Sequence, residues 1–143
     1  MLIAASSPIL ETMVRAPLIL DLCDRIAAEF SPERIILFGS HAYGAAADDS
    51  DVDLLIVISK GQDGYRKAAE ISQRVQPNFA VDMLVRTTAV LRERIALNDF
   101  FLSEIVNEGI VLYDAANARV GREGRKRLQQ RQAACASAQN AGL

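Results

Sequence analysis

The sequence of 143 residues contains no tryptophan and only two cysteines, Cys23 and Cys135. These two residues lie far apart and fit no metal-ligand spacing, which excludes a disulfide framework and a cysteine-based metal site. Cys23 falls within an apolar helical pattern, so we expect a reduced thiol in the protein core. This use of cysteine favours a reducing compartment.

Long hydrophobic runs are also absent. The longest stretch without Asp, Glu, Lys or Arg covers residues 35–47, which is too short to span a membrane. The first residues are apolar but carry no leading positive charge, and Glu11 and Arg15 interrupt them. We therefore expect neither a transmembrane segment nor a signal peptide, and we predict a cytoplasmic protein.

Positive charge is scarce in most of the chain. Residues 1–114 hold 10 Lys and Arg against 17 Asp and Glu, whereas residues 115–143 hold 6 against one. Because phosphate binding needs clustered cations, this balance excludes a broad nucleic-acid surface and leaves only the basic end for such contact. Hydrophobic residues make up 50% of the sequence, enough for the core of one small domain.

The hydrophobic pattern alternates between helix-like and strand-like segments. Helical spacing covers residues 65–75 and residues 18–30, where we expect Pro17 to begin the helix. Short apolar runs typical of buried strands cover residues 34–38, 52–58, 79–85 and 110–113, and further helices are expected around residues 91–95 and 101–106. This order predicts an α/β fold with helices packed on a sheet, in a single small domain of residues 1–114.

The C-terminal segment, residues 115–143, has a different composition. Apolar residues other than alanine nearly vanish there, and residues 119–131 form a basic, glutamine-rich run. Gly121 and Gly124 lower the helix propensity of its first part. We therefore expect a basic tail that is either an exposed helix or disordered.

Three aspartates occupy unusual positions in this pattern. Asp51 directly precedes the apolar strand at residues 52–58, and Asp53 lies near its start. Asp82 lies within the next apolar strand. Side chains two residues apart on a strand share a face, so Asp51 and Asp53 point the same way, and Asp82 joins them if the two strands are neighbours. The alternative is that Asp51 caps a turn while Asp53 and Asp82 face solvent at sheet edges.

Three carboxylates at such short range repel one another, and burying even one without compensation costs several kcal/mol. A divalent cation removes this conflict, because it neutralises the charge and occupies the oxygen lone pairs. Hard oxygen ligands select Mg²⁺ or Mn²⁺, which keep coordination positions open for substrate phosphates. We therefore predict that Asp51, Asp53 and Asp82 are metal ligands and catalytic residues.

A Gly-Ser pair follows the strand at residues 34–38. A glycine at that point lets backbone N–H groups approach a phosphate closely, and Ser40 adds a hydroxyl donor beside Gly39. Alone, the pair is only a turn signal. Placed directly upstream of a metal-binding set of carboxylates, it predicts a site for a nucleoside triphosphate.

The segment LFGSHAYGAAADDSDVDLLIVI, residues 37–58, resembles the core motif of the minimal nucleotidyltransferases in the polymerase-beta superfamily. That motif is a Gly-Ser pair, a spacer of about ten residues and Asp-x-Asp in a hydrophobic strand, which match Gly39, Ser40, Asp51 and Asp53. The third aspartate of the family matches Asp82 in VDMLV, and the resemblance also places Ser50 with Gly39 and Ser40 at the nucleotide.

The resemblance implies a mixed sheet with helices packed on it, two Mg²⁺ ions and ATP as substrate. Asp51 and Asp53 would then ligate both ions, and Asp82 would ligate one ion and help to deprotonate an acceptor hydroxyl. That hydroxyl would attack the α-phosphorus of ATP and release pyrophosphate. Many minimal members carry an arginine where this chain has His41, Ala42 and Tyr43, so the phosphate-facing cation is absent, weakened or supplied from elsewhere. A protonated His41 would be one substitute for this cation, but we expect His41 to lie at the surface.

The resemblance also implies a partner. It predicts a helical HEPN-type toxin in a hetero-oligomer, with this chain as the antitoxin that adds AMP to a tyrosine hydroxyl of the toxin. Two alternatives stay open. One is a nucleotidyltransferase that acts on a small molecule such as an antibiotic, and the other is a non-catalytic antitoxin that neutralises its partner by contact.

Overall fold

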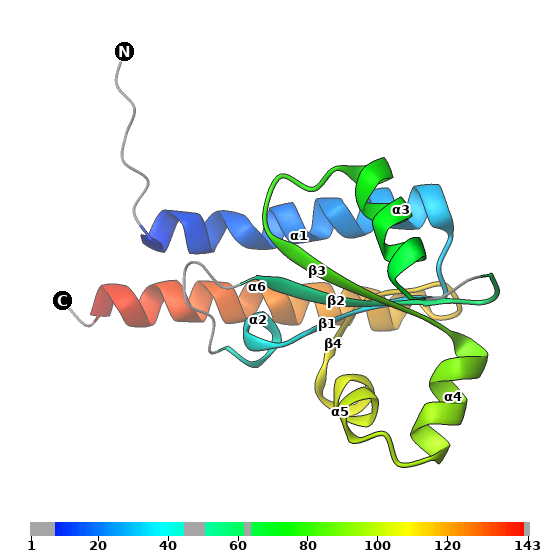
Figure 1. Cartoon of the computed structure of the whole chain (residues 1–143). Helices are drawn as coiled ribbons and strands as arrows, with labels where there is room; N and C mark the ends of the chain where they lie inside the picture. Colours follow the sequence, from blue (N-terminus) through cyan, green and yellow to red (C-terminus); the bar gives the residue numbers. More distant parts are fainter. Residues whose placement is uncertain (1–7, 45–50, 62–63, 142–143) are drawn as a thin grey trace.

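The computed structural model describes the backbone of residues 8–44, 51–61 and 64–141, and the side chains of residues 16–44, 51–61 and 64–133. The elements of Figure 1 are, in order, α1 (Pro8–Phe30), β1 (Arg34–Phe38), α2 (Ser40–Tyr43), β2 (Val52–Ile58), α3 (Tyr65–Val75), β3 (Val81–Thr87), α4 (Thr88–Ala96), α5 (Phe100–Glu108), β4 (Ile110–Asp114) and α6 (Ala118–Ala141). The predicted α/β fold is confirmed. In the described part of the chain, no helix is both long and apolar enough to cross a membrane.

The four strands form one mixed sheet in the order β3-β2-β1-β4. β2 and β3 run parallel, because helix α3 connects them and returns the chain to the same edge. β1 runs antiparallel to both of its neighbours, β2 and β4. The mixed sheet that the family resemblance implied is therefore present, and β2 and β3 are direct neighbours.

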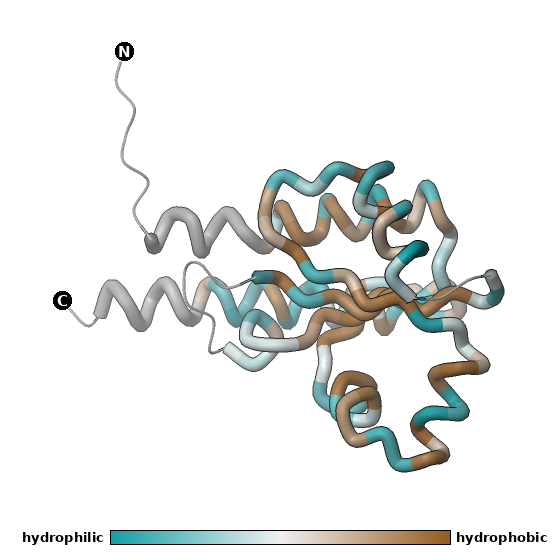
Figure 2. Tube along the Cα trace, viewed as in Figure 1, coloured by the Kyte–Doolittle hydropathy of each residue, from teal (hydrophilic) through white to brown (hydrophobic). Residues whose placement is uncertain are grey.

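Helices cover both faces of the sheet. Figure 1 shows α1 and α3 on one face and α4 and α5 on the other. Helix α6 belongs to the first face, because its Leu128 packs in the same buried cluster as Ile19 of α1 and Ile71 of α3. A second cluster joins Leu55 of β2 to Leu91 of α4 and Ile105 of α5. Figure 2 shows the resulting concentration of hydrophobic residues along the sheet between the helices.

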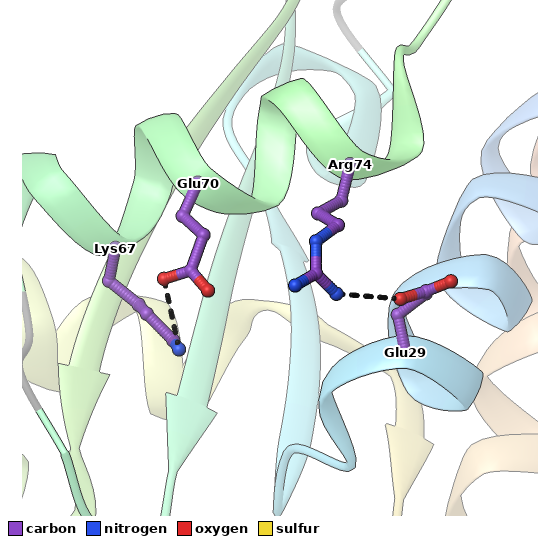
Figure 3. Close-up of polar contacts among 4 residues, drawn as sticks. All are labelled: Glu29, Lys67, Glu70 and Arg74. Atoms are coloured by element: carbon purple, nitrogen blue, oxygen red, sulfur yellow. Dashed lines mark hydrogen bonds and ion pairs between the residues drawn. The ribbon is translucent and has the colours of Figure 1, made fainter.

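Figure 3 shows an ion pair within helix α3 and a second one that connects α3 to the end of α1. Arg74 pairs with Glu29 at 3.1 Å, and Lys67 pairs with Glu70 at 3.3 Å. Both cations also lie over the ring of Phe30, at 5.3 Å for Lys67 and 5.8 Å for Arg74. Exposed pairs of this kind contribute little individually; Arg74 and the Phe30 ring are the contacts among them that join α3 to α1.

The C-terminal segment differs from the expected exposed or disordered tail. Helix α6 packs on β4 and α1, with Gly124 directly against the backbone of Val111 and Leu128 fully buried. Arg125 donates to the carbonyl of Leu112 at 3.0 Å and pairs with Asp24 at 2.6 Å. The glycines that weaken helix propensity are thus the residues that let the helix approach the strand.

The start of α1 also differs from the expectation. Pro17 does not begin the helix, since α1 begins at Pro8 and contains Pro17. The neighbouring N–H of Ala16 donates to Oε1 of buried Gln132 at 2.8 Å, which connects α1 to α6. Cys23 is a free thiol in the core, as predicted, and burial raises its pKa to about 12. The side chain of Cys135 lies outside the described residues.

Candidate active site

The turn after β1 has the backbone geometry that a Gly-Ser pair allows. Gly39 has a φ of 76°, a region that L side chains rarely adopt, and its carbonyl accepts from the N–H groups of Ala42 and Tyr43 at 3.0 and 3.2 Å. The four-residue helix α2 thus begins directly after Gly39. Ser40 is half-buried at its first position.

The sheet brings the predicted carboxylates to one face. Along β2, Leu54 and Ile56 pack toward α1 and α3, whereas Leu55 and Val57 pack toward α4 and α5. Asp53 shares the alternation of Leu55 and Val57, so its side chain lies on the face of α4 and α5. The carboxylates therefore sit at the end of that face where β2 begins.

The parallel pairing of β2 with β3 completes the set. Asp53 is the register partner of Asp82, and neighbouring strands lie about 4.8 Å apart. Asp51 precedes Asp53 by two residues and is exposed, as is Asp82, while Asp53 is half-buried. The condition stated from the sequence, that the two strands be neighbours, is met, so Asp53 and Asp82 lie side by side.

The electrostatics of Asp53 match this arrangement. Partial burial raises the pKa of Asp53, the negative charges of Asp82 and Asp51 raise it further, and His41 opposes them. The ionised form of Asp53 is therefore disfavoured by its surroundings. A cation at this point would relieve both the burial cost and the repulsion.

The chemistry of the donors fits Mg²⁺ or Mn²⁺, since carboxylate oxygens are the ligands these ions prefer. Within the described residues, no three Asp, Glu, His or Cys side chains converge as they would around a bound ion. The fit to a cation rests on charge, because the negative charges of Asp82 and Asp51 act on Asp53. The sequence between Arg34 and Lys60, which includes Asp53, contains no Lys or Arg that would compensate them.

Gly39 and Asp53 are in close contact. Phe38 is the register partner of Asp53, and a Cβ added at Gly39 would lie 2.2 Å from Oδ2 of Asp53. Only a glycine allows the turn to lie against this carboxylate. The Gly-Ser pair and the Asp-x-Asp strand, ten residues apart in the sequence, are therefore adjacent in the fold.

Two further predictions from the sequence have different outcomes. His41 is buried, with 8% of its surface exposed, and does not lie at the surface as expected. Ser50, predicted to bind nucleotide, lies outside the described residues.

Sequence reasoning missed Arg131, which reaches the turn from α6. Its guanidinium donates to the carbonyl of Ala42 and also lies beside Gly44. The residue is 89 positions away in sequence. The spacing of Gly121, Gly124 and Leu128 could have indicated this contact, because it marks one face of a packed helix. Arg131 continues that face and is thereby placed near the sheet.

We predict that Gly39→Ala lowers the free energy of unfolding by about 2 kcal/mol, since it adds both backbone strain and a clash with Asp53. The matched control is Gly64→Ala: Gly64 caps α3 with nearly the same backbone angles, φ 89° and ψ −157°, but has nothing within 4 Å of an added Cβ. Urea denaturation measures both variants. An equal loss in the two would show that the contact with Asp53 has no energetic weight.

Comparison with known proteins identifies this type of domain. The model of the family described as "Nucleotidyltransferase domain" matches residues 20–112, more than half of the chain. The structure is similar to the crystal structure of a protein from Sulfolobus solfataricus that is provisionally described as a nucleotidyltransferase. That comparison has a TM-score of 0.57 and 19% identity, and covers 81% of this chain and 96% of the other, which supports the fold alone. No curated protein sequence matches the chain.

Proposed function

The chain belongs to the nucleotidyltransferase domain family, and from that premise we propose that it transfers AMP from ATP to a hydroxyl group of a partner protein. The observation that carries the proposal is the position of Asp53, between Gly39 on one side and Asp82 on the other. It supports the proposal because a set of carboxylates suited to a metal ion would then lie directly beside a glycine turn suited to phosphates.

The reaction balances as an in-line displacement. The acceptor oxygen forms a bond to the α-phosphorus of ATP, the bond from that phosphorus to the bridging oxygen of the β-phosphate breaks, and pyrophosphate leaves. The acceptor hydroxyl loses its proton, and we assign this proton to the carboxylate of exposed Asp82. AMP remains attached to the acceptor through a phosphodiester bond.

Each part of the site has a role in this proposal. Gly39 and Ser40 hold the β- and γ-phosphates through the backbone of the turn and the serine hydroxyl. Asp51, Asp53 and Asp82 would hold Mg²⁺. Bound there, Mg²⁺ would neutralise phosphate charge and stabilise the attacking and leaving oxygens.

For the acceptor, we propose a tyrosine hydroxyl on a helical HEPN-type toxin, with this chain as the antitoxin. Support comes from the resemblance of residues 37–58 to minimal nucleotidyltransferases and from exposed apolar side chains around the start of α5, where Phe101 contacts Phe38 of β1. Phe100 is 84% exposed, Phe101 54% and Leu97 68%, and all three lie at or near the start of α5. A protein surface that covered them would gain apolar burial.

The test is the intact mass of proteins that co-purify with the tagged chain, measured before and after incubation with ATP and Mg²⁺. We expect a helical partner to gain one or more AMP units. A tight partner that gains no mass would contradict the proposal and favour neutralisation by contact. If no protein co-purifies and AMP appears on a small hydroxylated compound, the acceptor is a small molecule.

We predict that Arg131→Ala raises the KM for ATP about three- to tenfold with little effect on kcat, because the carbonyl of Ala42 loses its charged donor and the phosphate turn loosens. Arg131→Lys should restore part of the affinity. The control is Arg127→Ala, which removes the same charge from an exposed position on α6. Steady-state kinetics measure these values, and equal KM values for Arg131→Ala and Arg127→Ala would contradict the assignment.

A further inference from the structure

A cavity of about 500 Å³ lies between α2 and α5. Its walls are aromatic and polar, and its lining residues are Tyr43, Phe100, Ser103, Glu104, Asn107 and Glu108. The function proposed above uses Phe100 only as part of an exposed apolar surface and assigns no role to the cavity itself, which we call the α2–α5 pocket.

The α2–α5 pocket adjoins the turn that follows β1. Tyr43 closes the short helix that begins after Gly39, so one wall of the pocket belongs to the proposed phosphate turn. On the other side, Phe101 meets Phe38 edge-to-face with ring centroids 5.8 Å apart, and Phe38 is the register partner of Asp53. A group in the pocket would therefore lie beside the turn that is proposed to hold the phosphates.

The charge in this pocket is negative and uncompensated. Glu104 and Glu108 are exposed, and neither forms an ion pair with any described residue, although six such pairs occur elsewhere in the described chain. Burial is the largest cause that raises the pKa of Tyr43, and the negative charges of Glu104 and Glu108 raise it further. Glu108 also occupies the last position of α5, where the helix dipole disfavours an anion. A contribution to helix stability therefore does not explain why a glutamate stands at this position.

Two exposed aromatic rings complete the pocket. Phe100 is 84% exposed and Tyr43 is 42% exposed, which is unusual for large apolar side chains. Aromatic faces attract cations, and arginine in particular stacks on them. Carboxylates and rings around one cavity are the surroundings that a guanidinium or ammonium group prefers, whereas the same carboxylates would repel the phosphates of a nucleotide.

We infer that the α2–α5 pocket binds a basic side chain of the acceptor protein, an arginine or a lysine close to the hydroxyl that receives AMP. This inference rests on the proposed function, because it names the kind of protein segment that the site selects. Charge complementarity identifies the occupant. The shared residue Tyr43, which ends the helix that follows Gly39, explains the selectivity: the basic side chain would anchor the segment beside the proposed phosphate turn while its hydroxyl approaches the α-phosphorus.

The experiment uses two fluorescein-labelled synthetic peptides with one tyrosine each, identical except that the arginines flanking tyrosine in one are citrullines in the other. Fluorescence anisotropy at low salt, without ATP, measures binding to the native chain and to Glu104→Gln and Glu108→Gln. Glu93→Gln, an exposed position on α4, is the matched control for loss of one charge.

We expect the native chain and Glu93→Gln to prefer the arginine peptide roughly five- to tenfold, and each pocket variant to lose most of that preference. Added salt should weaken the preference as well. Equal binding of the two peptides by the native chain would overturn the inference, and so would an unchanged preference in the pocket variants.

A second readout separates this inference from the proposed function. The same peptides are incubated with ATP and Mg²⁺, and their masses are measured. Arginine preference in binding without AMP transfer would contradict the proposed function and leave the pocket assignment supported. Equal AMP transfer to both peptides would support the proposed function and contradict the pocket assignment. A raised KM for ATP in Glu104→Gln, with unchanged peptide binding, would assign the pocket to the nucleobase and overturn the inference.

Discussion

Replacing Asp53 with asparagine is expected to lower AMP transfer by about a thousandfold, since metal-assisted stabilisation of phosphoryl oxygens contributes several kcal/mol. The variant should nevertheless fold. Asp53 sits beside Asp82 and Asp51 and is partly buried, so its charge opposes folding at neutral pH in the absence of a cation. The melting temperature without Mg²⁺ should therefore stay equal to that of the native chain or rise. Rates of pyrophosphate release and circular dichroism melting curves measure the two effects.

Asp21→Asn provides the control for Asp53→Asn. Asp21 is exposed on α1, on the opposite side of the sheet, and among the described residues its ion pair is a surface contact with Arg25 at 3.1 Å. Its loss should cost less than about 1 kcal/mol and leave transfer unchanged. A variant Asp53→Asn with native activity would remove the carboxylates from the mechanism. A variant that melts far below the native chain would show instead that Asp53 is a structural residue.

Gly124→Ala is expected to produce the largest loss of stability, about 3 kcal/mol or more. A Cβ at this position would lie 1.7 Å from the carbonyl oxygen of Val111, which belongs to the backbone of β4 and cannot yield. Helix α6 would have to move away from the strand, and with it the contacts of Leu128 and Arg125. Urea denaturation of the variant measures the loss.

Gly121→Ala is the matched control, because it lies on the same face of α6 one turn earlier. A Cβ there would meet the carbonyl of Leu112 at 3.4 Å, a tight but adjustable contact, and alanine favours the helix by about 1 kcal/mol over glycine. Gly121→Ala should therefore lie near the native stability. Equal stability of Gly121→Ala and Gly124→Ala would mean that α6 does not pack on β4 as described.

The strands were predictable because buried apolar runs of this length have few other conformations. Two of them match the sequence prediction residue for residue, Arg34–Phe38 and Val52–Ile58. The third runs over Val81–Thr87 instead of residues 79–85, because its limits follow the parallel pairing with β2, from Val52 to Ile58, and not its own hydrophobicity. Strand pairing is a tertiary property that single-sequence patterns do not carry.

The proximity of Asp53 and Asp82 was partly predictable. Alternation along a strand placed Asp51 and Asp53 on one face, and only the sheet order made Asp82 their neighbour. The contact of Gly39 with Asp53 was not predictable from spacing, since it depends on β1 pairing antiparallel with β2.

Helix α6 was misjudged for a clear physical reason. Glycines count against an isolated helix, yet Gly124 is what allows α6 to touch β4, and the gain from packing outweighs the loss of propensity. Part of its basic run is used inside the fold: Arg125 binds Leu112 and Asp24, and Arg131 holds the turn at Ala42. Charge counts along a sequence cannot show which cations are already paired.

The most direct test of the central claim uses ATP labelled with radioactive phosphorus at either the α or the γ position. The labelled ATP is incubated with Mg²⁺, the native chain and the proteins that co-purify with it. Nucleotidyl transfer at Asp51, Asp53 and Asp82 predicts that the acceptor takes up the α label alone, and that Asp53→Asn abolishes this uptake. Uptake of the γ label, or α-label uptake that survives Asp53→Asn, would contradict the account.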